Sequence, residues 1–157
     1  MSITIRLATA NDLESILQLF QETIEVINAN DYSSKQIEVW KNGAGRKQRW
    51  LEKIGLHHFL VAELNNQIAG FASISKEGYL DFMYVSKDHQ RRRIATELYK
   101  ALEQFARENQ FSKITSDVSI TAKPFFQKQG FIVLHQQEVL IDGVPLINYK
   151  MEKFLSL

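Results

Sequence analysis

Three consecutive arginines, Arg91–Arg93, stand directly before a segment with the apolar spacing of a helix. The first turn of a helix carries partial positive charge from unpaired backbone N–H groups, so a basic cluster there is unfavourable without a counter-ion. A short loop between a strand and such a helix end can direct backbone N–H groups at phosphate oxygens, and arginine adds charge and paired donors. The cluster therefore predicts a phosphate-binding site, with a solvated basic patch as the alternative.

Composition restricts the classes of protein that could carry such a site. The 157 residues include 19 Lys or Arg and 18 Asp or Glu, so the chain has no overall field for nucleic acid or an anionic membrane. The absence of cysteine excludes disulfides, thiolate nucleophiles and cysteine-based metal sites. The histidines are scattered, and the adjacent His57 and His58 would point to opposite faces of a strand, so we expect no metal site.

The N-terminal segment lacks the long apolar core of a signal peptide. No apolar run approaches the roughly 20 residues that are needed to span a bilayer. We therefore expect a cytoplasmic protein that does not bind a membrane.

The elements that position the arginine loop follow from the spacing of apolar residues. Capping boxes at Thr9–Asp12 and Ser33–Gln36 predict helix starts, and Asn65-Asn66 and Asp142-Gly143 predict hairpin turns. The predicted elements are a strand at 3–7, helices at 13–27, near 37–40 and at 46–54, a hairpin over 58–75, a strand at 79–85, a helix from 94 to about 109, a strand at 114–118, a helix from about 121 that ends at Gly130, and a hairpin over 131–154. This order predicts a single α/β (α+β) domain over residues 1–157, with both parallel and antiparallel strand pairs.

A family resemblance is carried by three segments. The stretch YLDFMYVSKDHQRRRIATELYKALEQFA resembles the acetyl-CoA-binding motif of the GNAT superfamily of N-acetyltransferases, Q/R-x-x-G-x-G/A, which falls on residues 90–95. SITAKPFFQKQGF resembles the next segment of that family, and DYSSKQIEVW is similar to a signature, DYS-x-x-Q-x-x-x-W, of small single-domain bacterial members. The resemblance implies a mixed, mostly antiparallel central sheet flanked by helices. It also implies direct acetyl transfer from acetyl-CoA to a primary amine of a small molecule or peptide, with no metal.

The same resemblance implies where acetyl-CoA would bind. Backbone groups of one strand would pair with the pantetheine amides and polarise the thioester oxygen. The arginine loop and the start of its helix would hold the pyrophosphate. The residues expected to contact the cofactor are Met83, Tyr84, Val85, Gln90, Arg91, Arg92, Arg93, Ile94, Ala95, Thr96, Ser119 and Phe126.

Four residues depart from the family pattern. Arg93 stands where the family has glycine, and Arg91 stands where glycine is common; glycine lets the backbone approach the pyrophosphate closely. We expect the arginine side chain to swing outward and to bind phosphate, which would compensate. In the family, a tyrosine in this segment protonates the departing thiolate, and Phe126 stands in its place. Ser119 stands where many members have an asparagine. Phe126 has no proton to donate, so we expect it to pack either on the pantetheine arm or in the core.

Catalytic roles then fall to other side chains. Asp81 interrupts an apolar strand and is the expected base for the attacking ammonium, with a solvated or ion-paired structural carboxylate as the alternative. Tyr84, Tyr149 and Tyr32 are candidate proton donors to the thiolate, and packing is the alternative for each. In the family, the region of Tyr32 and Trp40 lines the acceptor cleft, so these two are expected to shape substrate specificity, with core packing as the alternative.

Two other classes of function remain open on the sequence. A binding module that keeps acyl-CoA but has lost turnover is suggested by Phe126, Ser119 and Arg93. A nucleic-acid-binding domain would use the arginine cluster, but the cluster is short, lacks interleaved aromatic residues and is not part of a basic excess, so we expect no nucleic-acid partner. The C-terminal hairpin could supply the edge of a homodimer.

Overall fold

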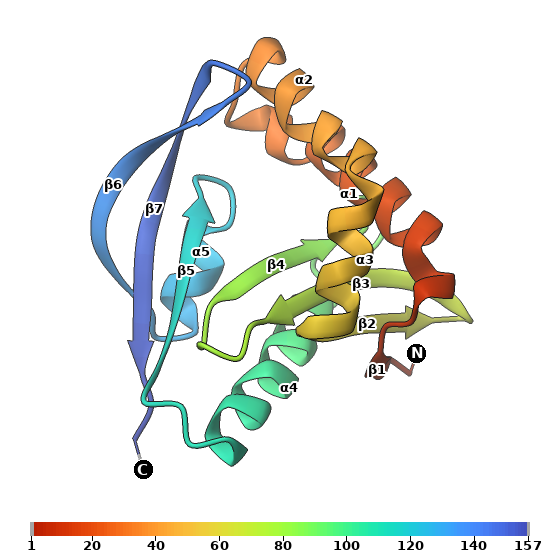
Figure 1. Ribbon diagram of the computed structural model, residues 1–157, viewed down its shortest axis with the longest axis vertical. Coiled ribbons are helices and arrows are strands. Elements are labelled where there is room, and N and C mark those ends of the chain that lie inside the picture. Colours follow the sequence, from red (N-terminus) through yellow and green to blue (C-terminus); the bar gives the residue numbers. More distant parts are fainter. Residues whose placement is uncertain (1, 157) are drawn as a thin grey trace.

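Two antiparallel sheets dominate the computed structural model, which describes residues 2–156 (Figure 1). The four-stranded sheet has the order β1 (Thr4–Leu7), β2 (His58–Leu64), β3 (Gln67–Ile74) and β4 (Leu80–Val85). The three-stranded sheet has the order β5 (Lys113–Ser119), β7 (Val144–Phe154) and β6 (Ile132–Ile141). The mixed and mostly antiparallel architecture predicted from the sequence is confirmed. Its division into two sheets was not predicted. The parallel pairing that was expected is reduced, among residues 2–156, to a single bridge between Tyr79 and Thr115.

Helices cover both faces of the four-stranded sheet (Figure 1). They are α1 (Leu13–Val26), α2 (Ser34–Lys41), α3 (Lys47–Leu56), α4 (Ile94–Glu108) and α5 (Lys123–Lys128), with 3-10 turns at Ala10–Asp12, Asn28–Asn30 and Asn42–Gly45. Both predicted capping boxes are present at the starts of Ala10–Asp12 and α2. Asn65, Asn66, Asp142 and Gly143 have positive φ, as the predicted hairpin turns require. No helix within residues 2–156 has both the length and the apolar character that crossing a bilayer demands.

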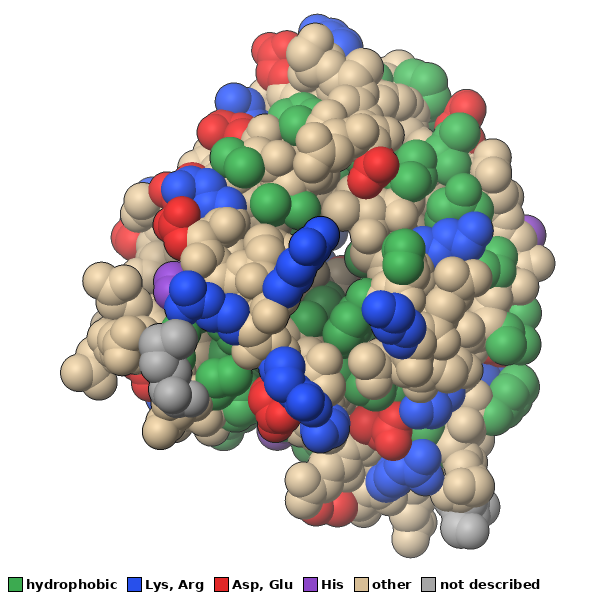
Figure 2. All heavy atoms as spheres, turned by 180° about the vertical axis from the view of Figure 1, so that it is seen from behind, with side chains coloured by type: hydrophobic (Ala, Val, Ile, Leu, Met, Phe, Trp, Pro, Cys, Tyr) green, Lys and Arg blue, Asp and Glu red, His purple; other side chains and the backbone are tan. Residues whose placement is uncertain are grey.

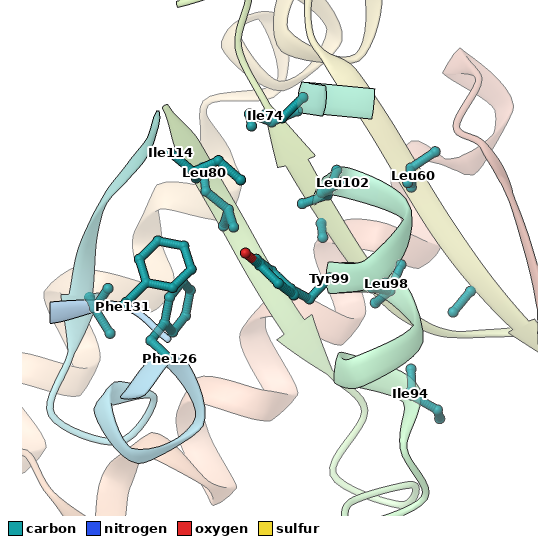
Figure 3. Close-up of a cluster of buried hydrophobic side chains, with 14 of the residues drawn as sticks. Leu60, Ile74, Leu80, Ile94, Leu98, Tyr99, Leu102, Ile114, Phe126 and Phe131 are labelled. Atoms are coloured by element: carbon teal, nitrogen blue, oxygen red, sulfur yellow. The ribbon is translucent and has the colours of Figure 1, made fainter. Parts of the chain in front are cut away.

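The alternation of side chains along β2 separates two hydrophobic clusters. Leu60 and Ala62 face α4, whereas Phe59 and Val61 face α1 and α3. Figure 3 shows the first cluster, in which Leu98 and Leu102 of α4 lie near Leu60. Residues from the second sheet complete it and include Ile114, Phe126 and Phe131. This shared cluster anchors α4, and therefore the loop before it, against both sheets.

The two sheets diverge on one side of the Tyr79–Thr115 bridge and are joined again at a distance from it. Near the bridge, Ser116 Oγ donates to the Leu80 carbonyl at 2.7 Å. Away from it, the hydroxyl of Tyr32 donates to the Ile147 carbonyl at 2.7 Å, which connects the segment before α2 to β7. Within the part of the chain that the structure describes, the edges of β4 and β5 are thus unpaired beyond the bridge.

Candidate active site

A cleft of about 920 Å³ lies between β4 and β5. Its basic side chains include Arg49, Arg91, Arg93 and Lys128, against the carboxylates of Asp81 and Asp117. Viewed from behind, Lys and Arg side chains surround a hollow that has hydrophobic side chains at its base (Figure 2). Predicted site residues that line the cleft are Tyr32, Trp40, Asp81, Met83, Tyr84, Val85, Gln90, Arg91, Arg93, Ile94, Ala95, Ser119 and Phe126. Arg92 and Thr96 do not line it.

The backbone of β4 has an open edge at Met83. Antiparallel strands alternate between residues that hydrogen-bond to the neighbouring strand and residues that face away from it. Ser86 N–H donates to the Ala69 carbonyl at 2.8 Å, and Tyr84 lies opposite Phe71, so Tyr84 is a residue that bonds to β3. The N–H and C=O of Met83 therefore face the cleft. This is the geometry that pairing with a pantetheine amide requires.

The end of β4 is fastened from two sides. The Val85 carbonyl accepts from Thr23 Oγ1 of α1 at 3.0 Å and from Gln90 Nε2 at 2.8 Å. Gln90 Nε2 also donates to the Ser86 carbonyl at 3.1 Å. Gln90 thus holds the loop to the strand, and the expected backbone pairing with the cofactor rests on Met83 and on the Val85 N–H.

The arginine loop has the backbone shape that glycine adopts most easily. Arg91 and Arg93 have φ of 62° and 65°, in the left-handed region. Residues with a Cβ atom pay roughly 1–2 kcal/mol there relative to the right-handed region. These are the two positions at which the sequence departs from glycine, so the loop keeps the glycine conformation although arginines occupy it. Both side chains are exposed and line the cleft.

A glycine that sequence reasoning missed sets the position of α4. A Cβ atom at Gly70 of β3 would lie 2.9 Å from Ile94 Cγ2, 3.1 Å from the Tyr84 carbonyl oxygen and 3.2 Å from Leu98 Cδ1. The first turn of α4 can approach the sheet this closely only because Gly70 has no side chain. Its small size thereby places the N–H groups at the start of α4 beside the open edge of β4.

Asp81 is ion-paired. Its Oδ2 atom lies 2.7 Å from Lys53 Nζ of α3, and the carboxylate is mostly buried. This is the structural pairing given above as the alternative to catalysis, and the role of base stays a prediction. Lys53 Nζ also lies 4.9 Å from the centre of the Phe82 ring, which fixes the ammonium from a second direction.

The candidate proton donors differ in what their hydroxyl groups do. Burial raises the pKa of Tyr84, and a hydrogen bond with Trp40 only partly opposes the rise. The Tyr32 hydroxyl is engaged twice, because it donates to the Ile147 carbonyl and accepts from Ile120 N–H at 3.0 Å. The ring of Tyr149 lies 4.2 Å from the Lys123 ammonium and does not line the cleft. Tyr84 and Tyr32 thus line the cleft, whereas Tyr149 does not, and the role of proton donor stays a prediction.

Ser119 and Phe126 have local structural tasks. Ser119 Oγ accepts from Ala122 N–H at 3.0 Å just before α5. Phe126 is 2% exposed and packs edge-on against Phe131, with ring centres 5.0 Å apart. Core packing thus accounts for Phe126, although its side chain also forms part of the cleft wall.

Asn148 was missed by sequence reasoning. Its Oδ1 atom is buried and has no hydrogen-bond partner within residues 2–156, and the residue lines the cleft from β7. A buried acceptor without a partner is costly, so a donor from a ligand would relieve it. Together with the open backbone of Met83 and the arginines of the loop, this acceptor suits the amides and phosphates of a coenzyme A thioester.

Comparisons with known proteins agree with this geometry. Residues 28–153 match the family model described as an acetyltransferase (GNAT) domain. The uncharacterized N-acetyltransferase YafP of Escherichia coli strain K12 is 33% identical over 150 residues, which are 96% of this chain and 95% of that protein. A GCN5-related N-acetyltransferase from Rhodopseudomonas palustris has a TM-score of 0.95 at 30% identity, over 99% of this chain and 97% of that one. PaiA N-acetyltransferase from Thermoplasma acidophilum, solved with coenzyme A, has a TM-score of 0.82 at 23% identity, over 99% and 100%.

Proposed function

This chain belongs to the GNAT family and is an acetyl-CoA-dependent acetyltransferase, and we propose that its acceptor is a primary amine of a small molecule or peptide. The observation that carries the proposal is the cleft between β4 and β5, which has an open backbone edge at Met83 and the ion-paired Asp81 on the same strand. Acetyl transfer requires only that the protein binds the thioester, that the amine is neutral and that the two lie close together.

When bound, acetyl-CoA supplies the acetyl group as a thioester. The Met83 N–H is proposed to bind and polarise the thioester region, and Arg91 and Arg93 to bind the phosphates. The amine nitrogen forms the new C–N bond while the C–S bond breaks and its electrons leave with sulfur. An acceptor that arrives as an ammonium ion first gives one proton through the base to solvent. The neutral amine then loses a second proton as one proton reaches sulfur, so the reaction is balanced without a further reactant.

Two side chains are proposed to move these protons. Asp81 takes the proton of the ammonium, directly or through one water, and the Lys53 ion pair holds its carboxylate in place. Tyr84 gives its proton to the departing thiolate. The phenol of Tyr84 is protonated at neutral pH, as a donor must be, and the burial that raises its pKa makes it a weaker acid. Tyr32 and Trp40, whose rings meet edge-on with centres 5.2 Å apart, are proposed to border the acceptor.

The proposed catalytic domain is the whole chain, residues 1–157. The segment before residue 28 supports this, because Thr23 of α1 anchors the Val85 carbonyl at the cleft. The arginine loop is proposed to bind the cofactor and not nucleic acid. A homodimer through the C-terminal hairpin stays a prediction, with β6 as the strand at the edge.

The test combines binding and turnover. Acetyl-CoA should raise the melting temperature, and purified protein should release thiol in the presence of an amine. Arg91→Glu should weaken the thermal effect, whereas Lys35→Glu, at an exposed site away from the cleft, should leave it intact. Thermal stabilisation without thiol release across a broad set of primary amines would contradict the proposed acceptor.

A further inference from the structure

A side pocket of about 370 Å³ adjoins the cleft. It shares Trp40, Arg49, Asp81 and Tyr84 with the cleft, so a molecule in it reaches the space beside β4. α2, the 3-10 turn after it, α3 and β4 supply most of its wall. The side pocket is therefore placed to hold an acceptor whose amine points into the cleft.

One arginine of the side pocket has no carboxylate partner among residues 2–156. Lys53 pairs with Asp81 at 2.7 Å, and Arg46 lies 3.9 Å from Asp142. Arg49 has no carboxylate within 4.0 Å among residues 2–156, although it lines both the cleft and the side pocket. The side pocket thus has a net positive charge carried by a guanidinium that can bind an anion through two parallel hydrogen bonds.

Aromatic rings make up much of the remaining wall, beside Val39, Asn42, Gly43 and Ile141. Trp50 stacks on Phe82 with ring centres 4.5 Å apart, and Phe20 meets Trp50 and Tyr84 edge-on at 4.9 Å and 5.1 Å. Trp40 completes this side of the pocket. Such rigid rings favour a flat or apolar body in the ligand over a flexible polar one.

We propose that the side pocket selects an acceptor amine that carries an anionic group, carboxylate or phosphate, next to an aromatic or apolar body. Arg49 binds the anion, the aromatic wall holds the body, and the amine points to the cleft beside Asp81. The inference rests on the proposed acetyl transfer to amines and deepens it by naming the class of acceptor.

Turnover on matched acceptors tests the selection. Phenylalanine and its phosphonate analogue should be acetylated with kcat/KM at least about 10-fold above phenylalaninamide, because hydrogen bonds to a charged partner are strong. Arg49→Gln should reduce this preference by about 10- to 100-fold. Lys47→Gln is the matched control, since it removes a positive charge from the same helix but pairs with Glu14 away from the pocket. The ratio of phenylalanine to its phosphonate analogue separates carboxylate from phosphate. Equal or faster turnover of the amide overturns the inference and leaves amine acetylation standing.

Fluorescence gives a reading that does not depend on turnover. The chain has two tryptophans, and both Trp40 and Trp50 line the side pocket. N-acetylphenylalanine should change their emission in wild-type protein with coenzyme A but not in Arg49→Gln, and its amide should have a weaker effect. If the emission changes in this way but no amine causes thiol release, the proposed function is refuted and the preference of the side pocket for an anion stands. No change of emission with either ligand overturns the inference.

Discussion

The cofactor end and the acceptor end of the cleft are built in different ways. At the cofactor end, the Met83 backbone, the left-handed arginine loop and the start of α4 come from one continuous stretch of chain. At the proposed acceptor end, Lys53 of α3 pairs with Asp81 of β4 and Arg49 of α3 lines the same side pocket, and the proposed chemistry depends on these side chains. We therefore expect the cofactor end to tolerate changes of side chain better than changes of backbone. The acceptor end should be more sensitive to changes of side chain.

The largest expected effect lies at the acceptor end. Asp81→Asn keeps the size of the side chain but removes the proposed base, so kcat should fall by about 10²–10⁴-fold. The increase in melting temperature caused by acetyl-CoA should remain, because the cofactor end is unchanged. Steady-state thiol release and thermal unfolding measure the two quantities.

Lys53→Met separates catalysis from the ion pair. It removes the partner of Asp81 but keeps the carboxylate, and should reduce kcat less than Asp81→Asn does. Equal losses in the two variants would mean that the pair itself, and not a base, is what the reaction needs. Turnover of Asp81→Asn at the wild-type rate would remove Asp81 from the mechanism.

The contrast between the two ends explains what the sequence could predict. The loop at 90–95 and the strand before it, which has an open edge, are local, so residue types and apolar spacing identified them together with the family resemblance. Arg49 carried no local signal, because its significance depends on α3 packing beside β4. An ion pair was one of the expected alternatives for Asp81, but the sequence could not identify Lys53 as the partner, because Lys53 is distant in the chain.

The division of the sheet was also beyond sequence reasoning. Periodicity predicted β4 and β5 as strands, but it does not say whether neighbouring strands pair or diverge. Contacts between distant segments, such as that of Tyr32 with Ile147, belong to the tertiary fold and leave no local signal. In the sequence, nothing distinguishes Gly70 from another strand glycine, because the close packing of α4 against it is a property of the tertiary fold.

The next effect concerns the attachment of α4 to the second sheet. Burial would raise the pKa of Glu103, but hydrogen bonds from Lys153 of β7, Tyr99 and Arg107 outweigh it and lower the pKa to about 2 from its ordinary value of 4.5. The carboxylate therefore stabilises the fold above about pH 4.5, and this contribution is lost as the pH falls towards about 2. The loss should approach about 3 kcal/mol at most.

Urea unfolding at about pH 6 and about pH 3 measures this loss. Glu103→Gln should be less stable than wild type at the higher pH and should lose less stability on acidification. Asp12, whose pKa is also lowered by its hydrogen bond with Arg6, is the same in both proteins and cancels in the comparison. Identical pH dependence in the two proteins would mean that Glu103 does not secure α4.

A smaller effect is expected where α4 meets the first sheet. Gly70→Ala places a methyl group against Ile94 and the Tyr84 carbonyl, and should destabilise the protein by about 1–3 kcal/mol. It should also weaken acetyl-CoA binding, because the start of α4 must shift. Gly55→Ala is the control, since nothing lies within 4 Å of its added methyl group and alanine favours a helix. Thermal unfolding with and without acetyl-CoA separates the two effects, and an unchanged response to acetyl-CoA in Gly70→Ala would show that the loop does not depend on this contact.

The smallest effect distinguishes backbone from side chain within the cofactor end itself. Arg93→Gly relieves the left-handed conformation at φ of 65° but adds freedom to the unfolded chain, so a net stabilisation of about 0.5–1 kcal/mol is expected. The same change removes a proposed phosphate ligand and should lower the affinity for acetyl-CoA. Arg93→Ala removes the charge but keeps the conformational cost, so it should lose affinity without gaining stability. If both variants bind acetyl-CoA as tightly as wild type, the backbone of the loop is sufficient for the pyrophosphate, and the contrast between the two ends becomes sharper still.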